Sequence, residues 1–409
     1  MRLIRLQLAV YNQRQSLTKV AQFGRSNTQN QGTIAHSFFV RLVVTMKAGV
    51  SHNCDQNRNI RILLTGGGSA GHVVPNIALI PELRKAGFSV SYIASLRGIE
   101  NELLKPTGVP IFRIYTGKFR RYFSIRNLTD VFGVCAGFAQ SLFTLRRIRP
   151  DVVFSKGGYV ALPVVIAAWA LRIPIIIHES DVSLGVANRI SAKLARVVCI
   201  THKQTQSQIP HGKHVVLTGI PLRSQIFSGQ KDKGLNMCGF NKEKPVLLIL
   251  GGSLGSTNLN KIVKQTLHLL LKRFQVVHVT GTGKQVAAKL PDYRQFEYVN
   301  EIEHLYACAD IVVSRAGATT VAEISSLNKR NILIPVASTV SRGDQLENAS
   351  VYTKARLSRV IPEEQITSTI LYRAITSLYE NHATPQKTPI FINHRLAANK
   401  ISELASSLV

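Results

Sequence analysis

Acidic residues are scarce in this chain of 409 residues. Asp and Glu number 22 against 51 Lys and Arg, so the formal net charge is +29. Such an excess of cations attracts nucleic acid, anionic membrane surfaces or phosphorylated substrates. The excess is +7 in residues 1–59, +13 in 60–222 and +9 in 223–409, so a charged tail does not explain it.

Cysteine pairs and long apolar runs are also missing. The cysteines are odd in number and lack CxxC spacing, which argues against a disulfide framework or a zinc site and favours a reducing compartment; they are Cys54, Cys135, Cys199, Cys238 and Cys308. No run reaches about 18 apolar residues, so no membrane-spanning helix is expected. Hydrophobic residues still make up 45% of the chain, which excludes a wholly disordered protein.

Residues 1–59 differ from the rest in composition. Asp and Glu are absent from residues 1–54, while Gln, Ser, Asn and Arg are frequent, as in a transit peptide. The alternative is a disordered basic extension or a start placed too early, with Met46 as the true start. We favour the second interpretation, because a short polar segment leads from Met46 to the first expected strand.

After residue 59 the sequence alternates short apolar strands with helical segments. The expected strands of the first series are 60–65, 89–94, 151–155, 174–178 and 197–201, and a helix is expected at 76–86. Those of the second series are 245–250, 275–280, 296–299, 311–314 and 331–335, with a helix from about Asn258. Two such series predict an α/β protein with two Rossmann-like parallel-sheet domains, over 60–222 and 223–392.

Glycine-rich loops follow two strands of the first series, and a segment with His and two carboxylates follows another. The first contains Gly68, Ser69, Ala70, Gly71 and His72 and leads into a helix, whose N-terminus can bind an anion. It is no dinucleotide fingerprint, because no acidic residue follows the second strand. His72 stands where ligands bind in such folds, and an imidazole with its ordinary pKa of about 6.5 suits a general base.

Two further motifs lie at the same sheet edge. The segment 154–159 ends in a Gly-Gly turn and Tyr159, and the segment 178–188 contains Glu179, Asp181 and Asn188. Carboxylates so close to His178 are costly unless bound to something, so they are expected to act as a base or as acceptors for sugar hydroxyls. A metal site is less favoured, since no further His and Asp pair lies nearby.

The second series repeats the pattern with loops at 251–256, 314–323 and 343–349. Each joins a strand or turn to a helix and offers backbone amides suited to a diphosphate.

A basic and aromatic stretch interrupts the first domain. It reads Lys118, Phe119, Arg120, Arg121, Tyr122 and Phe123. Such interleaving suits the boundary of an anionic membrane. The alternatives are a core helix with a solvated basic face and, less favoured beside the glycine loops, a nucleic-acid site; we expect no nucleic-acid partner.

In order and spacing, these motifs resemble the MurG family of peripheral-membrane UDP-N-acetylglucosamine transferases over about residues 60–400. The segments are GGGSAGHVVP, SKGGYVALP, HESDVSLGVAN, GGSLGS, SRAGATTVAE and DQLENA. The resemblance implies a GT-B fold whose two domains face a cleft, with a last helix at about 393–409 returning to the N-terminal domain. It implies transfer of GlcNAc from UDP-GlcNAc to the 4-hydroxyl of MurNAc in lipid I, which forms lipid II for the cell wall.

The resemblance also assigns residues. On the donor side, Arg223 and Ser253 would contact the diphosphate, and the backbone near Val299 would contact the edge of the uracil. Ala318, Thr319 and Thr320 would contact phosphate and sugar, Glu323 the ribose and Gln345 the donor sugar. For the acceptor, the assigned residues are the loop Gly68–Gly71, Tyr159, Glu179 and Asn188, with Asn260 reaching across the cleft. Ala70 and the pair Ser180-Asp181 depart from the family pattern, which leaves the role of Asp181 open.

The expected mechanism is a one-step, in-line, inverting displacement with His72 as the first candidate base and Glu179 as the second. No metal or other cofactor is expected. The expected partners are UDP-GlcNAc, lipid I, the cytoplasmic face of an anionic bacterial membrane and other cell-wall enzymes. Three alternatives are a UDP-GlcNAc 2-epimerase-type isomerase, another GT-B lipid glycosyltransferase and a basic binding protein without activity.

Overall fold

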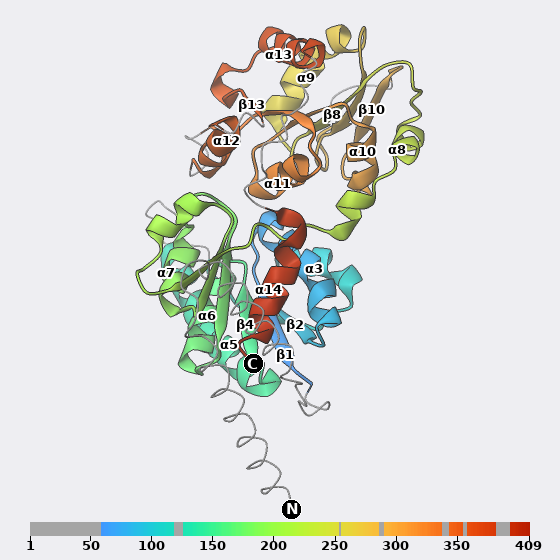
Figure 1. The fold of residues 1–409 in the computed structure, drawn as a ribbon. Helices are drawn as coiled ribbons and strands as arrows, with labels where there is room; N and C mark the ends of the chain where they lie inside the picture. Colours follow the sequence, from blue (N-terminus) through green and yellow to red (C-terminus); the bar gives the residue numbers. More distant parts are fainter. Residues whose placement is uncertain are drawn as a thin grey trace, which may run out of the picture. The chain divides into compact units, whose positions relative to one another are not determined.

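A computed structural model describes residues 59–117, 126–252, 255–285, 290–337, 343–354, 358–381 and 393–409. Residues 59–409 form one compact unit, and its described residues contain two parallel sheets (Figure 1). The prediction of two Rossmann-like α/β domains is therefore confirmed.

The first sheet has the strand order β3-β2-β1-β4-β5-β6-β7. Its strands are β1 (Arg61–Thr65), β2 (Ser89–Ser95), β3 (Ile111–Ile114), β4 (Val152–Ser155), β5 (Ile175–Glu179), β6 (Val197–Ile200) and β7 (His214–Leu217). Its helices are α3 (Ala70–Lys85), α4 (Glu100–Leu104), α5 (Arg126–Ile148), α6 (Ala161–Ala170) and α7 (Val186–Leu194). Buried apolar clusters lie on both faces, which explains why the strands are continuous apolar runs.

The second sheet has the order β10-β9-β8-β11-β12-β13. Its strands are β8 (Val246–Leu250), β9 (Gln275–Val279), β10 (Tyr293–Phe296), β11 (Ile311–Ser314), β12 (Arg330–Leu333) and β13 (Arg359–Val360). Its helices are α8 (Lys231–Cys238), α9 (Thr257–Leu270), α10 (Ile302–Cys308), α11 (Ala318–Ser326), α12 (Asp344–Lys354) and α13 (Ser368–Glu380). Here too an apolar cluster covers each face.

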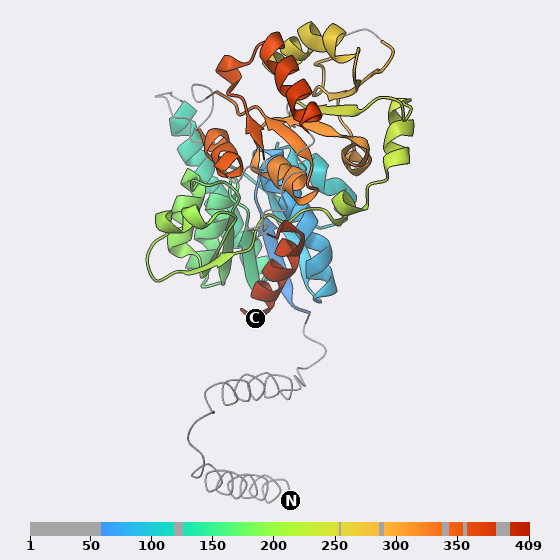
Figure 2. The ribbon, with the colours of Figure 1, turned by 45° about the horizontal axis from the view of Figure 1, so that its top comes forward.

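The last helix, α14 (Ala397–Ser406), packs on α3 of the first sheet rather than on the second (Figures 1 and 2). Its side chains Ala398, Ile401 and Ala405 belong to the apolar cluster of the first sheet, and Ser402 Oγ donates to the Glu82 carbonyl at 3.3 Å. The end of the chain therefore ties back to its first described segment.

Two expected elements begin three or more residues away from their positions in the structure. Helix α3 begins at Ala70, six residues before the expected start, because the glycine loop is shorter than the glycine pattern indicates. The expected strand at 296–299 lies at Tyr293–Phe296, a polar edge segment whose pairing with β9 fixes its register. Edge strands of this kind carry a weak apolar signal.

Candidate functional site

A cavity of about 1040 Å³ lies at the carboxyl ends of strands from both sheets. Segments that follow β1, β4 and β5 line it on one side, and segments that follow β8, β11 and β12 line it on the other. Ligands of doubly wound sheets bind at this edge. The cavity is therefore the candidate site.

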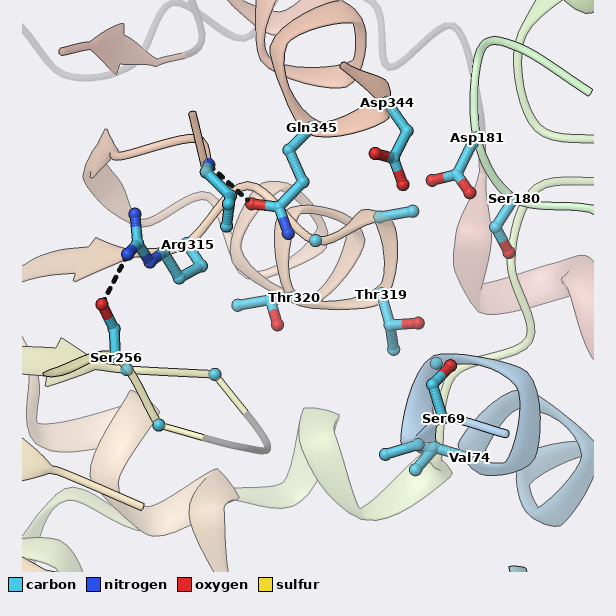
Figure 3. A pocket seen from close by; sticks show the side chains of 18 of the residues that line it. Ser69, Val74, Ser180, Asp181, Ser256, Arg315, Thr319, Thr320, Asp344 and Gln345 are labelled. Atoms are coloured by element: carbon cyan, nitrogen blue, oxygen red, sulfur yellow. Dashed lines mark hydrogen bonds between the residues drawn. The ribbon is translucent and has the colours of Figure 1, made fainter. Parts of the chain in front are cut away.

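Four helices begin at the wall of this cavity: α3, α9, α11 and α12 (Figure 3). The first turns of α3 and α11 contain no acidic residue, and neither helix has a side-chain cap. Unpaired backbone N–H groups and the positive end of the helix dipole attract anions at such positions. Of the three helices that the second sheet supplies, α9 is capped by Ser256 and α12 has Asp344 and Glu347 in its first turn, so α11 is the one suited to a diphosphate.

The first glycine loop is shaped by close packing against Tyr159. Gly68 has a φ of +86°, and a Cβ atom there would lie 2.3 Å from Cε1 of Tyr159. Its amide donates to the buried carboxylate of Glu100 at 3.4 Å. Beyond the loop, His72 Nδ1 lies 2.8 Å from the Ser69 hydroxyl, which orients the imidazole at the cavity wall.

The carboxylate of Glu179 is buried at the end of β5 and accepts four hydrogen bonds. Oε1 accepts from the amides of Ser180 (2.9 Å) and Asp181 (3.1 Å), and Oε2 from the Gly185 amide (3.1 Å) and Asn188 Nδ2 (3.0 Å). Glu179 does not line the cavity. Its contacts fix the loop between β5 and α7, so we interpret it as a residue that holds this loop rather than as a base.

Lys156 and Asp181 line the cavity from adjacent strands. Lys156 follows β4 and is only 1% exposed, while Asp181 follows β5 and is half-buried. Burial lowers the pKa of Lys156, and the charges of Glu179 and Asp181 oppose this change. Burial and the Glu179 charge raise the pKa of Asp181 to about 6. Asn348 Nδ2 donates to Asp181 Oδ1 at 2.8 Å.

The half-buried Arg223 lies beside the buried side chains of Glu323 and Tyr306 on the second-sheet side. The Tyr306 hydroxyl donates to Glu323 Oε2 at 3.0 Å. Burial raises the pKa of Glu323, while the Arg223 charge and the Tyr306 hydrogen bond lower it. Arg223 Nε is buried and has no hydrogen-bond partner among the residues that the structure describes. Because Arg223 lines the cavity and a buried donor without a partner is costly, this guanidinium is a candidate to bind an anionic ligand.

A second arginine, Arg315, follows β11. It forms an ion pair with Glu363 and donates to the Ser256 hydroxyl, which also caps α9 by accepting from the Leu259 amide at 3.2 Å (Figure 3). Both partners of the ion pair are largely buried. Arg315 therefore fixes the N-terminus of α9 relative to β11.

The expected site residues divide into three groups. Those that line the cavity are Ser69, Ala70, Gly71, His72, Asp181, Arg223, Ala318, Thr319, Thr320, Glu323 and Gln345. Those that do not line it are Gly68, Tyr159, Glu179, Asn188, Asn260 and Val299. Ser253 and the stretch Lys118–Phe123 lie outside the described residues.

Three residues of the second group have other positions. Asn260 is buried, and its amide donates to the carbonyls of Thr280 (3.0 Å) and Lys284 (3.2 Å), so in this structure it does not reach across the cavity. Tyr159 lines a separate cavity of about 630 Å³. Val299 packs against the apolar cluster on one face of the second sheet.

Several cavity residues were not expected from the sequence. Lys156, Ser256, Arg315 and Asp344 lie inside its motifs, whereas Lys284 and Glu363 lie outside them. Lys156 stands directly before the Gly157-Gly158 turn, and this position is the signal that could have indicated it. Among the described residues, no cluster of three or more His, Cys, Asp or Glu side chains is suited to a metal ion.

Two family models match the chain. The glycosyltransferase family 28 N-terminal domain matches residues 62–200, and the family 28 C-terminal domain matches residues 246–404.

Curated relatives and solved structures agree with this match. A "UDP-N-acetylglucosamine--N-acetylmuramyl-(pentapeptide) pyrophosphoryl-undecaprenol N-acetylglucosamine transferase" from Lachnoclostridium phytofermentans is 46% identical over 83% of this chain and 97% of its own. A relative of the same name from Legionella pneumophila (strain Paris) is 43% identical over 85% of this chain and 95% of its own length. The crystal structure of Acinetobacter baumannii MurG has a similar fold, with a TM-score of 0.64 and 24% identity over 86% of this chain and all of that chain.

Proposed function

The chain belongs to glycosyltransferase family 28 and is a UDP-N-acetylglucosamine-dependent hexosyltransferase, and we propose that it works in the cavity between its two sheets. It transfers N-acetylglucosamine to the N-acetylmuramyl unit of (pentapeptide) pyrophosphoryl-undecaprenol, lipid I, and so forms lipid II. The resemblance seen in the sequence is confirmed, and the isomerase and the inactive binding protein are not retained.

The donor binds to the second-sheet side in this proposal. The observation that carries it is that the uncapped N-terminus of α11 and Arg223, whose Nε has no partner among the described residues, line the same cavity. The leaving UDP gains negative charge as the glycosidic bond breaks. Fixed N–H dipoles and a guanidinium aimed at that charge stabilise the transition state more than the ground state.

The acceptor sugar approaches from the side of the first glycine loop. The 4-hydroxyl attacks the anomeric carbon from the face opposite UDP, and His72 takes the hydroxyl proton. Ser69 supports this role, because its hydroxyl orients the imidazole at 2.8 Å. A base in hydrogen-bond reach of the nucleophile is the arrangement that one-step displacement needs.

Replacement of Arg223 tests the donor side. In Arg223→Ala, the dissociation constant for UDP rises about 10- to 100-fold, because a hydrogen bond to a charged group contributes about 1.5–3 kcal/mol. Isothermal titration with UDP measures it. Lys261→Ala, which removes an exposed cation from α9, is the matched control and leaves UDP binding unchanged. Equal UDP affinity in Arg223→Ala and the wild type would contradict the assignment.

The reaction itself is tested with radiolabelled UDP-GlcNAc in detergent, with and without lipid I. Label moves into the lipid fraction only when lipid I is present. A diacylglycerol acceptor in a parallel reaction separates this activity from that of another GT-B lipid glycosyltransferase. Label in diacylglycerol but not in lipid I would overturn the proposed acceptor.

Membrane docking also belongs to the proposal. Within the described ranges, no helix has the length and apolar character needed to span a bilayer. The adjacent helices α5 and α6 carry the exposed aromatic side chains Phe143 (70%) and Trp169 (56%), and α5 follows closely after the basic stretch 118–123. We expect binding to anionic vesicles that weakens with salt.

Neutralising three cations tests this docking. The variant Lys118→Gln, Arg120→Gln, Arg121→Gln loses most of its sedimentation with anionic vesicles at low salt, since each cation contributes about 1 kcal/mol near such a surface. Vesicle binding that is unchanged in the triple variant, or that does not weaken as the salt concentration rises, would contradict the proposed docking.

A further inference from the structure

The chain passes from the first sheet to the second through residues 218–223 and returns to the first sheet at its end. The first passage follows β7 and ends at Arg223, which lines the cavity. The return leads into η5 (His394–Leu396), the short helix just before α14. The Ile220 amide donates to His394 Nδ1 at 3.0 Å. This hydrogen bond joins the two passages, although they lie 174 residues apart in the sequence.

The segment 218–223 is fixed to the first sheet at its start. The Thr218 amide donates to the Ile200 carbonyl at 3.0 Å. His178 is fully buried on β5, and its Nε2 lies 2.7 Å from the Gly219 carbonyl. A carbonyl oxygen can only accept, so this nitrogen carries the proton and donates. Gly219 has a φ of +79°, which favours glycine, and the turn there sets the direction of the residues that follow.

The same segment packs on α11 of the second sheet directly after this turn. Ile220 and Leu222 are buried in an apolar cluster with Ala322, and Ala318 packs against it. Ala318 is the first residue of α11, whose N-terminus lines the cavity. The helix η5 also packs on α11 (Figure 1). The segment that ends at Arg223 therefore lies between β5, η5 and α11.

A second contact from η5 reaches the residues after Arg223. The guanidinium carbon of Arg395 lies 4.7 Å from the ring centroid of Phe227, within the range of a cation–π interaction. Phe227 belongs to η3 (Ser224–Ser228), which begins directly after Arg223. The helix η5 thus contacts the chain on both sides of Arg223, at Ile220 and at Phe227.

The contact with Ile220 requires a neutral imidazole. A backbone amide can only donate, so His394 Nδ1 accepts and carries no proton. His394 is buried, and this burial together with the charge of His202 lowers its pKa to about 4. The imidazole is therefore an acceptor at neutral pH. Without that acceptor the buried Ile220 amide is unpaired, which is costly unless the segment shifts.

We propose that His394 is a positioning residue for donor binding: it accepts the Ile220 amide and so fixes the short segment that places Arg223 at the cavity. Pro221, with its restricted φ, and the buried Leu222 are the only residues between Ile220 and Arg223. A shift at Ile220 is therefore passed on to the guanidinium. This inference deepens the proposed function, because it rests on Arg223 as a ligand of the UDP diphosphate.

The positioning role is tested by isothermal titration of the full chain with UDP at neutral pH. In His394→Leu, which removes the acceptor, the dissociation constant rises about fivefold, less than in Arg223→Ala. In His394→Asn, whose Oδ1 stands near the place of Nδ1 and can accept the same amide, the constant stays within about twofold of the wild type. The matched control His211→Leu replaces an exposed histidine and leaves UDP binding unchanged.

A double-mutant cycle tests whether His394 acts through Arg223. In the Arg223→Ala background, His394→Leu changes the dissociation constant by less than about twofold, because the group that it positions is gone. An equal loss in both backgrounds, or a His394→Asn variant as weak as His394→Leu, would overturn the proposal.

The same titrations separate this inference from the donor site itself. Unchanged UDP binding in His394→Leu, together with weaker binding in Arg223→Ala, would refute the positioning role and leave the donor site standing. Unchanged binding in both variants would refute the donor assignment of Arg223 and the positioning role with it. If His394→Leu does not fold, His394→Gln, which moves the acceptor away from the place of Nδ1, takes its place in the cycle.

Discussion

Replacing His72 with alanine lowers kcat about 10²- to 10⁴-fold, the usual contribution of a general base, and leaves UDP affinity within about threefold. The reason is the position of His72, which lies in the first turn of helix α3 at the cavity wall. This wall belongs to the first sheet, whereas the proposed donor site lies on the second-sheet side. Its imidazole acts on the acceptor hydroxyl and not on UDP. Steady-state transfer to lipid I and titration with UDP measure the two quantities separately.

Ser69→Ala is the graded control for His72→Ala. It removes the hydroxyl that orients Nδ1 but keeps the imidazole, so kcat falls less than in His72→Ala, by about tenfold or less. A His72→Ala enzyme that turns over at the wild-type rate, or one that loses UDP binding to the same extent as turnover, would refute the base assignment.

Replacing Glu179 with alanine destabilises the fold by about 3–5 kcal/mol. Four N–H donors lose their acceptor, and each buried donor left unsatisfied costs about 1–3 kcal/mol, some of which water recovers. The donors are the amides of Ser180, Asp181 and Gly185 and the side chain of Asn188. Urea unfolding followed by circular dichroism measures the loss.

Two variants serve as controls for Glu179→Ala. Glu179→Gln keeps one acceptor oxygen and gives an intermediate loss, whereas Glu102→Ala removes an exposed carboxylate and changes stability by less than about 0.5 kcal/mol. If Glu179→Ala were as stable as the wild type but inactive, Glu179 would be a base after all, and the structural interpretation would be wrong.

Local chemistry explains what the sequence could predict. Apolar runs such as Val246–Leu250 are buried on both faces, and the loop with Gly68 needs a backbone that other residues rarely adopt. Such features depend on a few consecutive residues. The buried central strands, the two-domain α/β class and the glycine-loop motifs could therefore be predicted from the amino-acid sequence alone, whereas the outer strands β3, β7 and β13 were not expected.

Pairings across the chain explain what the sequence could not predict. Arg315 meets Glu363 at a separation of 48 residues, and Asp181 meets Asn348 at 167. The sequence places Asn260 near the second glycine loop, but the buried hydrogen bonds that hold it inside the second sheet come from tertiary contacts. The burial of Lys156 is likewise set by the strands around β4, and no local pattern encodes it.

The linkage formed in the product is the most direct test of the account. The purified chain, UDP-GlcNAc with its α-anomeric centre and lipid I are incubated, and the disaccharide is released and analysed by NMR. Attack from the face opposite UDP in a single step predicts a β-linked GlcNAc on the 4-oxygen of MurNAc. An α-linkage, which requires two displacements, or attachment at another oxygen would contradict the proposed arrangement of donor, acceptor and His72.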